Sequence, residues 1–161
     1  MTEFLNQQNL EIFGQLALAV VLGALIGIER RIAGKRAGMR TYALVSMGSA
    51  LFSVISAVAF SEFIGVTNFD PSRIVSQIVV GVGFIGAGSI IFQRSSLHGL
   101  TTAAGIWVAA GIGTAVGFKL YSLAVFATIL TIIVFIILWL IEKKLIAKWP
   151  YVNSDADAGE N

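Results

Sequence analysis

The sequence contains no cysteine and a single histidine among its 161 residues. Without thiols it cannot form disulfides or a thiolate zinc site, and one imidazole cannot make a histidine cluster. Charge is scarce as well, since only 12% of the residues are Asp, Glu, Lys or Arg, against about 25% in soluble domains. These shortages exclude a soluble enzyme domain and a disordered chain, and the net charge of +2 is too small to indicate nucleic-acid binding.

Apolar and aromatic residues make up 57% of the chain and gather in long runs. A bilayer with a hydrocarbon core about 30 Å thick needs about 20 apolar residues of α-helix to cross it. No run alternates strictly between polar and apolar residues, as the strands of a membrane barrel do. The sequence therefore predicts an all-α, polytopic membrane protein with five transmembrane helices, at residues 10–28, 41–60, 74–92, 101–118 and 122–141.

The basic residues predict the orientation of these helices. Nine of the eleven Lys and Arg residues lie in loops or tails on one side of the predicted membrane, and two, Arg73 and Lys119, lie on the other. Short cytoplasmic loops are enriched in Lys and Arg, so the N-terminus is predicted to be outside and the C-terminus in the cytoplasm. The predicted organisation is an extracytoplasmic tail at 1–9, a transmembrane domain at 10–148 and a disordered cytoplasmic tail at 149–161.

Glycines are concentrated in the first four predicted spans and absent from the fifth. Glycine weakens a helix in water, but in lipid it allows neighbouring backbones to approach closely. Close helix packing is the favoured interpretation, and the alternative is that span three breaks near Gly83–Gly88 to expose backbone to a solute, as in transporters. The glycines expected at helix contacts are Gly23, Gly27, Gly81, Gly83, Gly86, Gly88, Gly113 and Gly117.

The first two predicted hairpins also show a faint repeat. Gly27 and Gly38 are eleven residues apart, as are Gly88 and Gly99. In the same register Thr41 matches Thr102 and Ala43 matches Ala104. The pattern is compatible with a parallel structural repeat.

A polar strip at the outer end of span three is the first candidate site. Asp70-Pro71 is typical of a helix start, with a capping acceptor followed by proline at the first helical position. Arg73 and Gln77 follow three and seven residues later on the same helical face, so the three residues could instead form a site for an ion or small solute. Asp70 is the residue of this strip that we consider as a metal ligand. The metal ion considered is Mg²⁺, either bound at the site or transported by the protein.

Glu29 and Arg40 form a second candidate site, at the predicted cytoplasmic ends of spans one and two. An ion pair between them would fasten the first hairpin, and binding of a cytoplasmic ligand is the alternative. Glu29 and Asp70 lie about one membrane thickness apart, so they cannot chelate one Mg²⁺ ion. His98 and Asp70 lie on opposite faces, so no catalytic triad forms, and neither enzymatic activity nor a resident cofactor is expected.

Several short motifs carry a family resemblance. They are Gly23-Ala-Leu-Ile-Gly27-Ile-Glu29-Arg30, Gly38-Met-Arg40-Thr41, Asp70-Pro71-Ser72-Arg73, Gly83-Phe-Ile-Gly86-Ala-Gly88 and Gly99-Leu-Thr101-Thr102-Ala-Ala. In this order and spacing, across Leu16–Gly117, the chain resembles the MgtC/SapB family of bacterial inner-membrane proteins. The resemblance implies a helical membrane domain tied to magnesium homeostasis. Longer members add a cytoplasmic C-terminal domain, and because this sequence stops soon after span five, a role that depends on such a domain is not expected.

Two kinds of function are compatible with that resemblance. The first is transport of a cation or small solute across the bacterial inner membrane, through a homo-oligomer held together by the glycine faces. The second is regulation without transport, by binding another membrane complex such as the ATP synthase. A transporter requires Asp70 and Gln77 to face a hydrated cavity, whereas a regulator is favoured if they face lipid or only cap the backbone.

Overall fold

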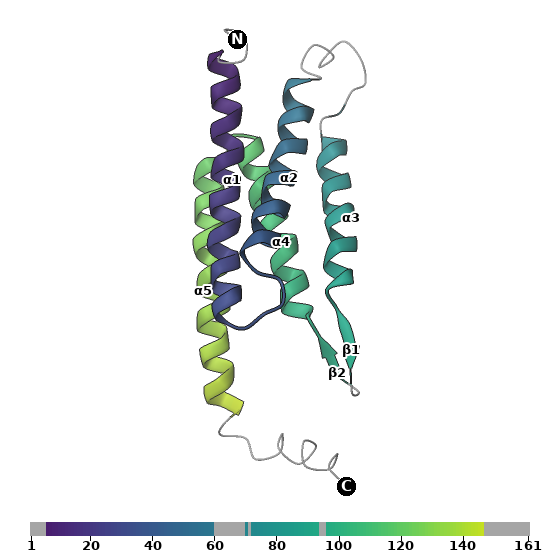
Figure 1. Cartoon of the computed structure of the whole chain (residues 1–161), viewed down its shortest axis with the longest axis vertical. Coiled ribbons are helices and arrows are strands. Elements are labelled where there is room, and N and C mark those ends of the chain that lie inside the picture. Colours follow the sequence, from purple (N-terminus) through teal and green to yellow (C-terminus); the bar gives the residue numbers. More distant parts are fainter. Residues whose placement is uncertain (1–5, 60–69, 71, 94–95, 147–161) are drawn as a thin grey trace.

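The computed structural model describes residues 6–59, 70, 72–93 and 96–146 as five helices and one short hairpin (Figure 1). The helices run up and down, so the start of the first and the end of the last lie at opposite ends of the bundle (Figure 1). The prediction of an all-α polytopic membrane protein is confirmed. The elements are α1 Gln7–Ile32, α2 Met39–Val58, α3 Ser72–Gly88, β1 Ile91–Gln93, β2 Ser96–His98, α4 Leu100–Gly117 and α5 Tyr121–Ile146.

Four of these helices, α1, α2, α4 and α5, are long and apolar enough to cross a membrane. Helix α3 is apolar but has only 17 residues, a rise of about 26 Å, close to the lower limit for a span. The predicted tails at 1–5 and 149–161, and the basic residues Arg94 and Lys148, lie outside the described residues. Residues 7–9, predicted as part of the first tail, already belong to α1.

The predicted end of the third span at residue 92 is wrong. Helix α3 ends at Gly88, and the Ser89 hydroxyl donates a hydrogen bond to the Gly86 carbonyl at 2.7 Å. The chain then enters an antiparallel hairpin in which Ile91 pairs with His98 and Phe92 with Leu97. A hydropathy window counts Ile and Phe as apolar in any conformation, whereas these residues also favour strands, so the window extended the helix too far.

The core of the bundle lies where α1, α2 and α4 meet. The two most extensive interfaces are those of α2 with α1 and of α2 with α4, and α4 contributes the largest share of buried positions. Helix α5 adds a single buried stripe made by Ala124, Thr128, Thr131 and Phe135. Helix α3 buries only Ile78, Val82 and Gly86, so it is the peripheral helix on the other side. Both outer helices therefore present most of their apolar side chains to the surroundings of the bundle.

Candidate functional site

Asp70 lies directly ahead of α3 and is exposed. Its Oδ1 atom accepts the backbone N–H of Ser72 at 2.9 Å, and its carbonyl oxygen accepts the backbone N–H of Arg73 at 3.2 Å. Hydrogen bonds from the side chain and the backbone of Ser72 lower the pKa of Asp70 below its ordinary value. The carboxylate thus caps the first turn of α3, as the helix-start interpretation predicts.

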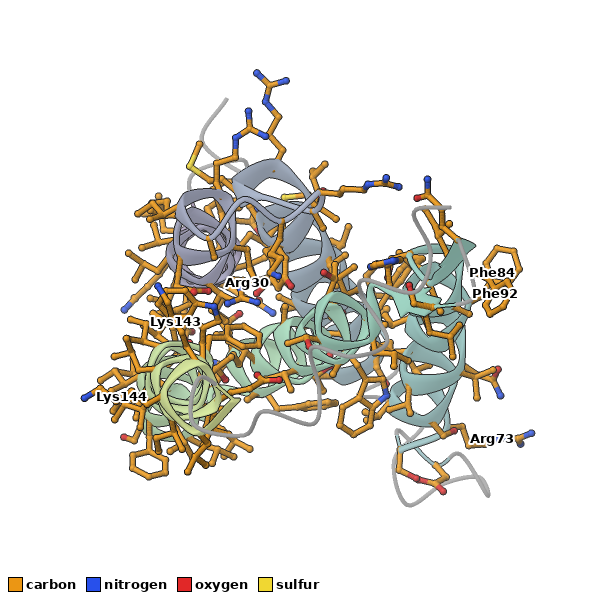
Figure 2. The ribbon with its side chains drawn as sticks, turned by 90° about the horizontal axis from the view of Figure 1, so that it is seen from below. Arg30, Arg73, Phe84, Phe92, Lys143 and Lys144 are labelled. Carbon is orange, nitrogen blue, oxygen red and sulfur yellow. The ribbon has the colours of Figure 1, made fainter. Side chains whose placement is uncertain are left out.

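Arg73 and Gln77 face different surroundings from Asp70. Arg73 is exposed and points away from the bundle (Figure 2). Gln77 lines a groove of about 540 Å³ between α2 and α3. The rest of the groove is almost entirely apolar, with glycines on both walls, and includes Leu44, Val45, Gly48, Phe52, Ile78 and Gly81. The structure thus does not gather the three residues around one polar cavity.

Glu29 forms its ion pair with Arg30, so the predicted pair between Glu29 and Arg40 is wrong. The Arg30 Nε and Nη2 atoms both donate to the Glu29 carboxylate, the second at 2.6 Å. Arg40 is exposed at the start of α2. Because Arg30 occupies both carboxylate oxygens in a bidentate arrangement, the hairpin between α1 and α2 is not fastened by Glu29.

Arg30 is a buried charged residue that was not predicted as a site residue from the sequence. It is only 3% exposed, and Figure 2 shows it pointing into the bundle, whereas Lys144 points away. Its guanidinium lies 3.7 Å from the centre of the Phe135 ring on α5. A buried arginine needs such partners, because removing its charge from water is costly unless it is paired. The Glu29–Arg30 pair therefore joins the end of α1 to α5.

Tyr42 extends this buried polar cluster toward α4. Its side chain is fully buried, and its hydroxyl donates to the Thr102 carbonyl at 3.4 Å. Gly105 makes room for the tyrosine, since a Cβ atom at that position would lie 2.5 Å from the hydroxyl and 2.8 Å from the Phe135 ring. The cluster is thus packed directly against backbone and leaves no room for a ligand.

A column of buried serines follows the inner face of α2. Ser46, Ser49, Ser53 and Ser56 are each at most 3% exposed. Their spacing of three or four residues places them on one helical face. Ser53 donates to the Ser49 carbonyl at 2.8 Å, and among the described residues the Ser46 hydroxyl has no hydrogen-bond partner. The spacing of these serines is visible in the sequence. Serine is only weakly polar, however, so the sequence did not predict them as a buried polar column.

Four of the predicted packing glycines lie where helix backbones meet. A Cβ atom at Gly23 would lie 2.5 Å from the Tyr42 carbonyl oxygen, and one at Gly27 would lie 2.5 Å from the Met39 Cα atom. Gly117 would approach the Ala50 carbonyl oxygen to 2.6 Å, and Gly113 would overlap the carbonyl group of Ser46. The three-helix core is therefore closed by backbone contacts that only glycine permits.

The glycines of α3 are different. The helix is continuous from Ser72 to Gly88, so the alternative prediction of a break near Gly83–Gly88 is wrong. A Cβ atom at Gly86 would lie 3.5 Å from the carbonyl oxygen of Ala103 on α4, which is an ordinary contact distance. Gly81, Gly83 and Gly88 have open space where a side chain would be. Any close packing by these three glycines must involve a neighbour other than this chain.

No group of three or more carboxylate or histidine side chains within the described ranges could hold a metal ion. Asp70 as a metal ligand therefore stays a prediction. The arrangement offers instead a closed core, a glycine-lined outer groove and a basic end near the hairpin.

Comparison with known proteins gives this geometry a context. The model of the MgtC family matches residues 16–144. The "Putative magnesium transporter YhiD" of Escherichia coli strain K12 is 45% identical over 122 residues, which is 74% of this chain and 57% of that protein. Protein MgtC of Salmonella typhimurium strain LT2 is 43% identical over 115 residues, 71% of this chain and 47% of that protein.

Protein SrpB of Synechococcus elongatus is also similar, with 41% identity over 129 residues, 74% of this chain and 70% of that protein. The chain thus spans about half the length of the curated relatives YhiD and MgtC. No solved structure matches this chain. The residues matched by the family model include all five motifs from which the resemblance was inferred.

Proposed function

The chain belongs to the MgtC family, and on this premise we propose that it is a bacterial inner-membrane protein of magnesium homeostasis that regulates another membrane protein by binding it. The name of the E. coli relative supports the link to magnesium, and the bacterial origin of the relatives supports the assignment to a bacterial inner membrane. The proposal assigns the chain no catalytic step and no resident cofactor. Mg²⁺ is the ion whose supply the protein serves.

The closed core of α1, α2 and α4 is the observation that carries this proposal. Mg²⁺ releases its water reluctantly and keeps several water ligands in most protein sites, so a path for it must be wide and polar. Between these helices the backbones meet at Gly23, Gly27, Gly113 and Gly117, where not even a Cβ atom would fit. A single protomer therefore offers no such path through its core.

The outer polar strip supports the same reading. Asp70 caps the backbone of α3, and Gln77 lies in a groove that is otherwise almost wholly apolar. Neither side chain faces a polar cavity of the kind that a transport site requires. A transporter was expected to have Asp70 and Gln77 facing a hydrated cavity. Because neither residue does so, this arrangement favours a regulator over a transporter.

The groove between α2 and α3 is the surface we assign to the partner. Gly48 and Gly81 line it with open space above both Cα atoms, so a transmembrane helix of another protein could approach the backbone closely. The Gln77 amide would then supply one hydrogen bond inside the membrane, worth about 1 kcal/mol. Small residues for contact and one polar group for register are typical of helix association in lipid.

Gly81→Leu is expected to abolish the protein's contribution to growth at low magnesium, because the leucine side chain would fill the groove. The protein should still insert and fold, since nothing lies within 4 Å of that position. Growth of a deletion strain complemented with each variant measures the effect. Gly83→Leu is the matched control, because Gly83 is equally open and on the same helix but does not line the groove. Equal growth with both variants would contradict the assigned surface.

A second candidate function, a conduit between several copies of the chain, is favoured by one observation. Gly83 and Gly88 are open on α3 and do not line the groove, so α3 could pack against a second protomer. In that arrangement a path would lie between protomers instead of inside one.

Reconstitution separates the two functions. The full chain would be placed in liposomes that contain a fluorescent Mg²⁺ indicator, with Mg²⁺ added outside. A regulator should give the same fluorescence trace as empty liposomes, with and without a membrane potential. Saturable Mg²⁺ entry that depends on the protein would overturn the regulatory proposal and support the conduit.

A further inference from the structure

A second cavity lies at the opposite end of the bundle from Asp70, beside the hairpin. It has a volume of about 560 Å³ and is formed by the α1–α2 connection, the ends of α3 and the hairpin, and the start of α4. This volume is typical of small-molecule sites. Its polar lining comes from four separate segments and includes Lys35, Arg36, Thr41, Ser89, His98 and Thr102.

The charge around this cavity has one sign. Lys35 and Arg36 line it, and no carboxylate is among its described lining residues. An adjoining cavity of about 440 Å³ shares Arg36 and Thr41 with it and adds Arg31 and Arg40. The carboxylate of Glu29 is already bound by Arg30, so it does not neutralise this group. Four cations thus line two adjoining cavities, an arrangement that attracts an anion.

Two helices begin at this cavity, and neither start is capped by a side chain. Gly38 precedes α2 and Gly99 precedes α4, with no side-chain hydrogen bond at either cap. Gly99 has φ +95°, and a Cβ there would overlap the Ser89 carbonyl oxygen, so glycine is required. The first turn of each helix has unpaired N–H groups and the positive end of the helix dipole. Thr41 and Thr102, which match in the sequence repeat, place both first turns on the cavity wall.

The Thr102 side chain gives an independent indication of a ligand. The residue is only 7% exposed and lines the cavity. Its carbonyl accepts the hydrogen bond of Tyr42. Its hydroxyl is not among the fully buried side-chain atoms of the described residues that have no hydrogen-bond partner, so it is open to the cavity that the residue lines. A hydroxyl can both donate and accept a hydrogen bond, so this one is available to an occupant of the cavity.

We infer that this cavity binds a phosphate-bearing anion, held by Lys35 and Arg36, the first turns of α2 and α4, and the Thr102 hydroxyl. A phosphate group has several acceptor oxygens and matches this set of donors, which contains two cations, two helix starts and a hydroxyl. The phosphate could belong to a soluble compound or to a lipid headgroup, since the site lies at one end of the membrane-crossing helices. The inference does not depend on the proposed partner at the α2–α3 groove.

The test measures binding of two probes to the purified full chain in a neutral detergent at constant ionic strength. Inorganic pyrophosphate, titrated by calorimetry, represents soluble phosphate compounds. Phosphatidic acid, followed by native mass spectrometry against phosphatidylcholine, represents a headgroup. Saturable binding of either probe is expected, and the probe that binds more tightly identifies the source of the phosphate. Absence of saturable binding for both would overturn the inference.

Variants locate the binding. The double substitution K35Q/R36Q is expected to raise the Kd about tenfold or more, because it removes two charge-assisted contacts. Thr102→Val keeps the shape of the side chain and should raise the Kd about threefold to tenfold by removing the hydroxyl. K143Q/K144Q removes the same charge from the end of α5, where both residues are exposed and neither lines the cavity, and should leave the Kd unchanged. Equal effects of the two double variants, or a wild-type Kd for Thr102→Val, would show general charge attraction and overturn the assigned site.

Discussion

Gly113→Ala is expected to lower the free energy of unfolding by about 3 kcal/mol or more, which is at the upper end for an overpacked core. The new methyl group would lie 2.7 Å from the carbonyl carbon of Ser46 and would overlap its oxygen. Both atoms belong to the backbone of α2, so no side-chain rotation can relieve the contact. The two helices would have to separate along the centre of the bundle, where Val116 and Ala50 are fully buried.

The neighbouring Gly111 provides the matched control. It lies on the same helix, and a Cβ atom there would meet nothing within 4 Å. Alanine has a higher helix propensity than glycine by about 0.8–1 kcal/mol, and both substitutions gain this term in the same helix. Gly111→Ala should therefore leave the melting temperature of the detergent-solubilised protein unchanged or raise it. A wild-type melting temperature for Gly113→Ala would show that α2 and α4 are less tightly joined than their backbone contacts indicate.

Arg30→Met is the second substitution with a large expected effect. It removes the guanidinium that holds the Glu29 carboxylate, whose side chain is only 14% exposed. Breaking one partner of a buried ion pair costs about 3–5 kcal/mol, because the other charge is left without compensation. The loss of the contact with the Phe135 ring adds to this cost. The free energy of unfolding in detergent, from denaturant titration, measures the change.

Two further variants separate the ion pair from general effects of charge. The double substitution E29Q/R30M removes both charges and should recover most of the lost stability, since replacing a whole buried pair is often neutral. Arg31→Met removes a charge one position later, where the side chain is exposed, and should change stability by at most about 0.5 kcal/mol. If Arg30→Met behaved like Arg31→Met, Arg30 would not be a structural charge.

The sequence predicted the membrane class and the approximate helix positions because both depend on the length of apolar runs. The starts of α2, α4 and α5 agree with the predicted spans to within two residues. The end of α3 was missed for a physical reason. Residues Ile90 to Phe92 are apolar whether they form a helix or a strand, and only the pairing with residues 96–98 decides between the two.

The candidate site was harder to predict than the fold. Arg30 and Arg31 are the same residue type at adjacent positions, so they point to different sides of helix α1. One side is buried and the other exposed, and the residue type alone does not distinguish them. A signal was present, because Gly23, Gly27 and Arg30 recur at spacings of four and three along one helical face. Asp70 was recognised, but the choice between a cap and an ion site depended on where Ser72 places its N–H group.

The buried position of Arg30 also has a consequence for how the protein is made. The predicted orientation counts Arg30 among the residues that hold a loop on the cytoplasmic side, a decision taken as helices enter the membrane. At that stage α5 has not been synthesised, so Phe135 is absent and the arginine can still reach lipid headgroups. Withdrawal of Arg30 into the bundle requires the last helix. With that predicted orientation, α1 is expected to be oriented before it is packed, and contact with Phe135 of α5 completes the burial of Arg30.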